Sequence, residues 1–224
     1  MNVCLFDIDG TLLDTGGAGQ AAMESALTSE FGADKAVEGV STAGRTDRAI
    51  TADMFRFFGF EETAENWQRF VSAYLEFLPE HLEARNGAVL PGIPALLETL
   101  SARDDVLLGL LTGNYAQGAR LKLEHYWLHE HFQFGGFGDK HYHRDDVARE
   151  AIVELGRHYD GDVEIERVWV IGDTPADVAC ARAIGARVVA VSTGLYSSGE
   201  LESADPDHLF ADFADPAPLL ELLQ

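Results

Sequence analysis

VCLFDIDGTLLD, residues 3–14, is the most informative stretch of this chain. Its first four residues form a short apolar run, which is typical of a buried strand in a parallel sheet. Asp7 and Asp9 follow the run, and residues two apart in extended chain point to the same side. We therefore expect both carboxylates beyond the carboxyl end of the strand, where open α/β sheets bind ligands. Gly10 allows a sharp turn there.

Two carboxylates placed this close repel, so one of them tends to hold a proton more tightly than the other. Such a pair suits a nucleophile or metal ligand beside a group that carries a proton. The pair by itself is equally compatible with a strand-end turn, because Asp and Gly are common turn residues. The longer string DxDGT is expected by chance in only roughly one chain in several hundred.

The composition limits the partners of this 224-residue chain. Its formal net charge is -22, which argues against binding nucleic acid or an anionic membrane through a broad basic surface. No apolar run approaches the ~18 residues of a membrane span, and the start lacks the pattern of a signal peptide. Cys4 and Cys180 lie in apolar segments and are expected to be reduced, so we expect a cytoplasmic protein.

The hydrophobic pattern divides the chain into two parts. Residues 16–86 show helical spacing without strand-like alternation, and Pro79 is expected to end or kink the last long helix. Residues 87–224 alternate apolar strands with amphipathic helices, which predicts a parallel sheet covered by helices. We therefore expect an α/β core of residues 1–15 and 87–224, built as a Rossmann-like doubly wound parallel sheet, and an inserted all-helical domain of residues 16–86.

The stretch LFDIDGTLLDT resembles the first motif of the haloacid dehalogenase (HAD) superfamily, which consists mostly of phosphatases with an aspartate nucleophile. The resemblance implies a HAD-like core with a helical cap. It also implies a Mg²⁺-dependent phosphatase of the phosphoglycolate-phosphatase type, acting on a small phosphorylated metabolite. In this family's pattern Asp7 attacks phosphorus and forms an aspartyl-phosphate. Asp9 protonates the leaving oxygen and later takes a proton from water.

A second polar turn, Thr112, Gly113 and Asn114, follows the apolar run of residues 106–111. A hydroxyl group and free backbone N–H groups at the start of a helix form an anion site. An ordinary strand–turn–helix with a threonine cap is the alternative. In the family, a threonine or serine at this strand end binds the phosphoryl group that is transferred, and Thr112 matches it.

The positive residue of the family pattern is a lysine at the start of a later helix, and this sequence departs from the pattern. Arg144 takes the family position best, and Lys140 in the preceding loop is the second choice; the other lysines are Lys35 and Lys122. Arginine keeps the charge and adds forked hydrogen bonding. The alternative is that Arg144 only pairs with a nearby aspartate.

The string VIGDTPAD resembles the fourth family motif, with Asp173 at the end of a strand and Asp177 four residues later. This spacing brings both carboxylates to one side of a helical turn. With the Asp7 side chain and the Asp9 backbone carbonyl, the resemblance makes them ligands of Mg²⁺, a cation that prefers oxygen donors. The alternative for Asp177 is a helix-start acid favoured by the helix dipole.

In the inserted region, the loop residue Arg45 is the expected substrate contact, with Arg48 as an alternative and a solvated loop as the competing interpretation. Two other functions stay open. One is a sugar phosphomutase of the β-phosphoglucomutase type, which shares Asp7 and Asp9. The other is a non-catalytic binding protein on the same fold, because the lysine motif is altered. The pattern does not distinguish a monomer from a homodimer.

Overall fold

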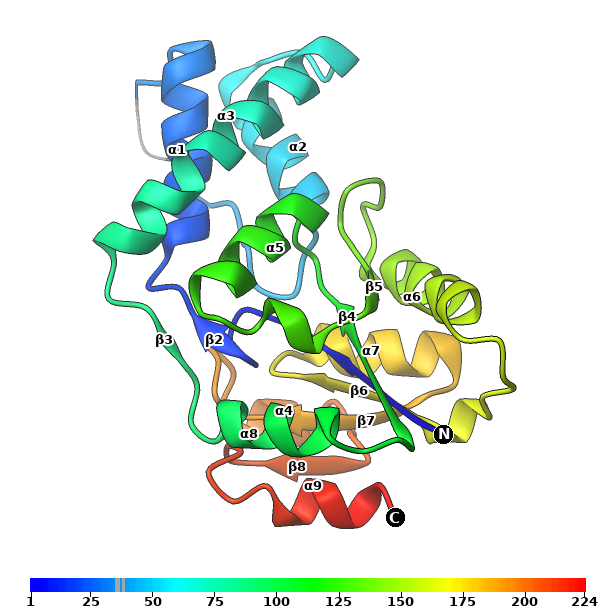
Figure 1. Ribbon diagram of the computed structural model, residues 1–224. Coiled ribbons are helices and arrows are strands. Elements are labelled where there is room, and N and C mark those ends of the chain that lie inside the picture. The colour runs from blue at the N-terminus through cyan, green and yellow to red at the C-terminus, as the bar shows by residue number, and fades with distance from the viewer. Residues whose placement is uncertain (35–36, 38) are drawn as a thin grey trace.

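The computed structural model, which describes residues 1–34, 37 and 39–224, contains a parallel six-stranded sheet (Figure 1). The strand order is β5-β4-β1-β6-β7-β8. The strands are β1 (Asn2–Phe6), β4 (Val106–Leu111), β5 (Phe134–Gly136), β6 (Val168–Gly172), β7 (Arg187–Val191) and β8 (His208–Phe210). The order reverses direction at β1, which lies between β4 and β6. The predicted doubly wound sheet is therefore confirmed. Lys35 lies outside the described residues.

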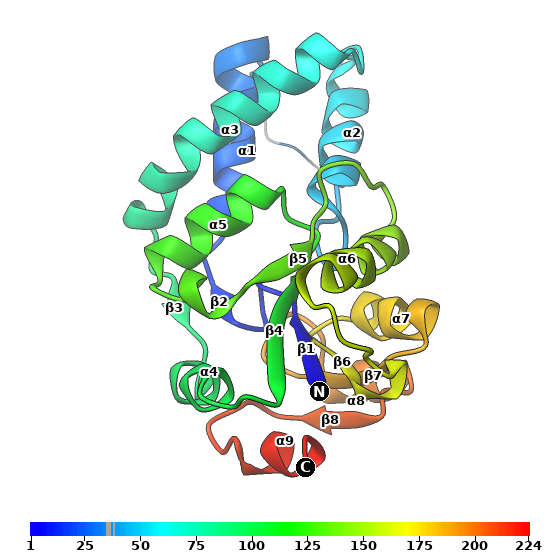
Figure 2. The same ribbon diagram turned by 45° about the vertical axis from the view of Figure 1, so that its right-hand side comes forward.

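Helices cover both faces of the sheet, as Figure 2 shows. Val3 and Leu5 of β1 pack with residues of α6 (Arg144–His158) and α7 (Pro175–Ile184). Cys4 and Phe6 point to the opposite face. The helices on that face are α4 (Ile93–Ser101), α5 (Ala116–His125) and α9 (Ala217–Leu222). All five residues of β1 are buried, which is why the strand reads as a continuous apolar run rather than an alternating one.

The remaining elements of the core are short. The 3₁₀ helices η1 (His129–His131) and η2 (Ile165–Arg167) precede β5 and β6. The helix α8 (Ser198–Glu202), which the sequence pattern did not predict, lies between β7 and β8 and begins with a capping box at Ser197. In the part of the chain that the structure describes, no helix is both long enough and apolar enough to cross a membrane.

In its described residues, the inserted region forms the helices α1 (Ala18–Phe31), α2 (Asp47–Phe58) and α3 (Ala64–Ala84). They have a hydrophobic core of their own, with Phe55, Phe70 and Tyr74 fully buried. Both views place the three helices together on one side of the sheet (Figures 1 and 2). The chain leaves the core through β2 (Leu13–Asp14) and returns to it through β3 (Ala88–Val89), and these two short strands pair in antiparallel fashion. This pair was not predicted from the sequence.

The expectation that Pro79 ends its helix is wrong, and the alternative of a kink there stays a prediction. Helix α3 contains Pro79 and continues to Ala84. Proline cannot donate the backbone hydrogen bond of a helix interior and costs about 3 kcal/mol there. Leu78 and Leu82 are buried on either side of it, so the packing of the last turns against the insertion core offsets that cost.

Candidate active site

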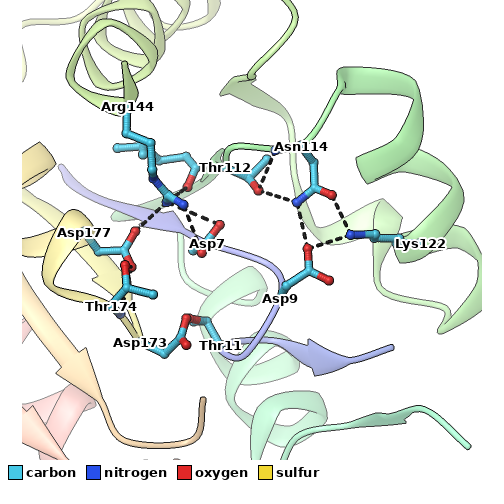
Figure 3. Close-up of polar contacts among 11 residues, drawn as sticks. Asp7, Asp9, Thr11, Thr112, Asn114, Lys122, Arg144, Asp173, Thr174 and Asp177 are labelled. Carbon is cyan, nitrogen blue, oxygen red and sulfur yellow. Dashed lines mark hydrogen bonds and ion pairs between the residues drawn. The ribbon is translucent and has the colours of Figure 1, made fainter. Parts of the chain in front are cut away.

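The polar residues that follow three neighbouring strands meet at one edge of the sheet (Figure 3). Asp7 follows β1, Thr112 follows β4 and Asp173 follows β6, and all three are buried. Asp7 and Asp173 line a cavity of about 430 Å³ that also receives Met23, Ile50 and Tyr74 from the helical insertion. The cavity therefore lies between the carboxyl ends of the strands and the inserted helices.

Three buried carboxylates form an acidic centre, and two of them, Asp7 and Asp173, line this cavity. Asp7, Asp173 and Asp177 each offer an oxygen atom, and these atoms all lie within 4.8 Å of one another. Burial raises the pKa of Asp7 to about 6, against the opposing charge of Arg144. Burial, together with the charges of Asp177 and Asp7, raises the pKa of Asp173 to about 8. A cluster of this kind favours either protonation or a hard cation with oxygen ligands, so the donor set fits Mg²⁺.

Two glycines make room for Asp173. A Cβ atom at Gly10 would lie 2.4 Å from Asp173 Oδ2, and one at Gly194 would lie 1.7 Å from the same oxygen. Gly10 also has a φ of 84°, in the left-handed region that favours glycine. The other oxygen of Asp173 accepts a hydrogen bond from Thr11 Oγ1 at 3.1 Å. Gly10 was predicted from the sequence as a turn residue, whereas Gly194 was not predicted.

Both oxygens of Asp177 contact protein groups. Oδ2 accepts hydrogen bonds from the backbone N–H of Thr174 (3.0 Å) and from Thr174 Oγ1 (2.7 Å), which completes a capping box at the start of α7. Oδ1 forms an ion pair with Arg144 Nη2. Asp177 therefore holds the start of α7 and the guanidinium of Arg144. A cation beside it would have to share one of these oxygens.

Arg144 is the first residue of α6 and its side chain is 6% exposed. Its Nη2 lies 3.4 Å from Asp7 Oδ1 and donates to the carbonyl oxygen of Leu111 at 3.4 Å, in addition to its contact with Asp177. The guanidinium fork therefore joins the ends of β1 and β4 to the start of α7. Lys140 is exposed instead and lines a separate hollow with Glu150 and Glu154. The structure brings Arg144, and not Lys140, to the acidic centre.

The two arginines of the inserted loop take different places. Arg45 borders the cavity, where its Nη1 forms an ion pair with Asp53 at 2.7 Å. Arg48 is not among the residues that line the cavity, and its guanidinium lies over the ring of Trp67, 3.9 Å from the ring centre. Of the two, Arg45 is the one placed to reach a substrate, and it would exchange part of its contact with Asp53 to do so.

The second polar turn is tied both to Asp9 and to the insertion. Asn114 Nδ2 donates to Thr112 Oγ1 and to Asp9 Oδ2, both at 2.8 Å. The carbonyl oxygen of Gly113 accepts a hydrogen bond from the backbone N–H of Asp47 at 2.7 Å. A Cβ atom at Gly113 would lie 2.0 Å from the carbonyl oxygen of Arg45. Glycine at this position therefore lets the inserted loop rest directly on the end of β4.

Sequence reasoning missed two buried charged residues of the site. Lys122 of α5 places its Nζ 2.6 Å from Asp9 Oδ2. The second residue is Asp47, whose Oδ2 accepts a hydrogen bond from the backbone N–H of Tyr115 at 2.9 Å. Burial raises the pKa of Asp47 to about 7, although Lys122 opposes the shift. The signal for Lys122 was a basic residue between Ala119 and Leu123 on the buried face of a helix.

Comparisons with known proteins place the chain among hydrolases. The family profile described as haloacid dehalogenase-like hydrolase matches residues 4–191. A phosphoglycolate phosphatase from Rhodospirillum rubrum is 30% identical over 220 residues, which is 94% of this chain and 87% of that protein. The crystal structure of a hydrolase from Pseudomonas syringae is 25% identical, with a TM-score of 0.73 over 100% of this chain and 99% of that one.

A further solved structure shares the fold at lower identity. CbbY from Rhodobacter sphaeroides, in complex with phosphate, has a TM-score of 0.75 at 20% identity, over 96% of each chain. Together with the topology of the sheet, these likenesses confirm the predicted fold class.

Proposed function

This chain belongs to the haloacid dehalogenase-like hydrolase family, and from that premise we propose that it is a Mg²⁺-dependent phosphatase that hydrolyses a small phosphorylated metabolite. Membership of the family and the expectation of a hydrolytic enzyme are confirmed by the matches above. The observation that carries the proposal is the buried centre of Asp7, Asp173 and Asp177 with the Arg144 guanidinium beside it.

Asp7 is the proposed nucleophile. Its carboxylate lies at the end of β1 and lines the cavity, so a phosphorus atom can approach it from the cavity side. Attack forms a bond from a carboxylate oxygen to phosphorus, while the bond from phosphorus to the leaving oxygen breaks on the opposite side. The product on the protein is an aspartyl-phosphate. Water then attacks its phosphorus, which releases phosphate and restores Asp7.

Asp9 is the proposed acid and base. Its side chain is 42% exposed and lines the same cavity as Asp7. In the first half of the reaction it gives a proton to the leaving oxygen, and in the second half it takes a proton from the attacking water. The same carboxyl group therefore returns to its starting state after each turnover.

Positive charge and hydrogen-bond donors surround the place where the phosphoryl group would lie. Arg144 supplies a fixed charge next to Asp7. Thr112 Oγ1 accepts hydrogen bonds from Asn114, and no acceptor for its own hydroxyl hydrogen is found among the described residues, so that hydrogen is available to a phosphoryl oxygen. Mg²⁺ held by Asp7, Asp173 and the Asp9 carbonyl would offset negative charge on the phosphoryl oxygens. Asp177, whose oxygens already have partners, would support that site.

The insertion of residues 16–86 is proposed to act as a cap. The cavity has walls from both the strand ends and the inserted helices, so movement of the helices would open or close it. Closure would exclude water from the reacting groups. Arg45 at the cavity border is the proposed cap contact with the substrate. The relative from Rhodospirillum rubrum supports phosphoglycolate as the first substrate to test.

The proposal is tested by phosphate release from phosphoglycolate and p-nitrophenyl phosphate, with Mg²⁺ and with EDTA. We expect turnover with Mg²⁺ and none with EDTA. Asp7→Asn should abolish turnover, because an amide cannot serve as the nucleophile. Asp104→Asn, at an exposed aspartate outside the cavity, is the matched control and should behave as wild type. Undiminished turnover by the Asp7 variant, or a silent wild type over a panel of metabolite phosphates, would reject the proposal.

A further inference from the structure

A lysine ammonium lies against the proposed acid and base, in a place that the proposed mechanism does not use. Lys122 Nζ lies 2.6 Å from Asp9 Oδ2 and 2.6 Å from Asn114 Oδ1 (Figure 3). The lysine side chain is only 5% exposed. Lysine is almost never buried to this extent unless it is paired. The contact therefore has to be explained by what it does to Asp9 or to Asn114.

The hydrogen bonds at Asp9 are unequal between its two oxygens. Oδ2 accepts from Lys122 Nζ at 2.6 Å and from Asn114 Nδ2 at 2.8 Å. Within the described ranges, Oδ1 has no hydrogen-bonding partner, and the Asp9 side chain is 42% exposed where it lines the cavity. One oxygen is therefore held by two donors, while the other is free to meet a substrate.

Lys122 is itself held in place from several sides. Asn114 joins it to the end of β4, because the amide accepts from Lys122 with Oδ1 and donates to Thr112 with Nδ2. On the cap side, a Cβ atom at Gly19 would lie 3.3 Å from Lys122 Nζ, so the first turn of α1 covers the ammonium closely. The long side chain of this lysine has therefore lost most of its freedom before any substrate binds.

We propose that Lys122 is a positioning residue, which anchors Asp9 Oδ2 so that Oδ1 is directed at the leaving oxygen of the substrate. The role rests on the proposed function. As the bond from phosphorus to the leaving oxygen breaks, the proton on Asp9 Oδ1 passes to that oxygen, and Lys122 keeps its own protons throughout. Fixing the orientation matters because small misplacements of a reacting group cost large factors in rate.

The position of Lys122 separates this role from direct binding of the phosphoryl group. In Figure 3, Arg144 approaches Asp7 from one side, and Lys122 approaches Asp9 from the other. The protein acceptors of the ammonium are Asp9 and Asn114. A lysine that bound the phosphoryl group would assist all phosphate esters alike. A lysine that orients the proton donor assists those esters whose leaving group needs the proton.

The test compares two esters in Lys122→Met, which keeps the length of the side chain but removes its charge and its donors. Phosphoglycolate has a poor alkoxide leaving group, and p-nitrophenyl phosphate has a good phenolate leaving group. We expect kcat/KM for phosphoglycolate to fall by ~10²-fold, the lower end of the contribution of general acid–base catalysis. For p-nitrophenyl phosphate the fall should be no more than about 5-fold, because the phenolate needs little protonation. Lys122→Arg, which retains a donor for Oδ2, should recover part of the loss.

Lys140→Met is the matched control, since it makes the same change at an exposed lysine outside the cavity, and it should leave both esters unaffected. Thermal unfolding followed by circular dichroism checks that each variant is folded. If Lys122→Met does not fold, Lys122→Gln replaces it and should show the same selectivity with a smaller loss. If wild type does not cleave phosphoglycolate, the alkyl phosphate that it cleaves fastest takes its place.

Equal losses on the two esters, or a rise in KM without a fall in kcat, would overturn the positioning role and make Lys122 a substrate-binding residue. Unchanged kinetics in a folded Lys122→Met would also overturn it. In both cases the wild type remains active, so the proposed phosphatase function stands. A wild type that releases phosphate from no ester would instead reject the proposed function, and this role with it.

Discussion

The glycine at position 194 gives the sharpest test of the proposed metal site, because a single added carbon would displace a single ligand. A Cβ atom there would lie 1.7 Å from Asp173 Oδ2 and 2.6 Å from its Cγ. Ordinary van der Waals contact begins at 3.4 Å. In Gly194→Ala the oxygen must therefore withdraw by about 1.7 Å, whereas ligand distances at a metal site stay within about 0.2 Å of their ideal values.

The strain falls on the end of a side chain rather than on the backbone, so the carboxylate can rotate away and the fold should survive. Rotation would also disturb the hydrogen bond from Thr11 Oγ1 to Asp173 Oδ1. Changes that reorient a metal ligand in this way lower metal affinity or activity by about 10–100-fold. This corresponds to about 1.4–2.8 kcal/mol of binding free energy. We expect a loss of this size in the affinity of Gly194→Ala for Mg²⁺.

The assay is phosphate release as a function of Mg²⁺ concentration, supported by calorimetric titration of the metal-free protein with Mg²⁺. Gly199→Ala is the matched control, because a Cβ atom at Gly199 of α8 meets nothing within 4 Å. The control should bind Mg²⁺ as wild type does. If Gly194→Ala binds Mg²⁺ and turns over like the control, Asp173 is not the ligand that we infer, and the reasoning fails.

Two further predictions concern buried charges. Arg144→Met should lower the free energy of unfolding by about 3–5 kcal/mol in urea denaturation, because it leaves the buried carboxylate of Asp177 without its cation. The control is Arg149→Met, which removes an exposed ion pair on the same helix and should cost no more than about 1 kcal/mol. Equal losses in the two variants would contradict the argument. Asp47→Asn tests how burial makes the stability of the fold depend on pH. Burial raises the pKa of Asp47 to about 7 in the folded state. The contribution of Asp47 to stability is therefore fully present below its unfolded pKa and is lost as the pH rises through 7. Asparagine does not titrate, but it can still accept the hydrogen bond from the Tyr115 N–H. The melting temperature of the variant relative to that of wild type should therefore rise between pH 5 and pH 8. A constant difference over that range would show that Asp47 does not titrate there.

The sequence alone determined the sheet and the acidic centre at its edge. Asp7 and Asp9 directly follow an apolar run, and their placement on one side of the chain is predictable from the local sequence because side-chain direction alternates along a strand. Asp177 and Thr174 are three residues apart, so their capping box is also a local property. Parallel strands end at the same edge of a sheet, and this brings the first and fourth motifs together without any further information.

Packing decided what local patterns could not. Pro79 is a helix breaker by propensity, yet the burial of its neighbours keeps α3 intact. Lys140 and Arg144 are four residues apart and carry the same charge. Arg144 reaches the acidic centre because α6 begins at this residue. Lys122 and Asp9 are 113 residues apart in the sequence. Gly194 meets Asp173 although α7 and β7 lie between them along the chain. Contacts of this kind arise when α5 and the loop after β7 pack against the sheet, so no spacing along the chain encodes them.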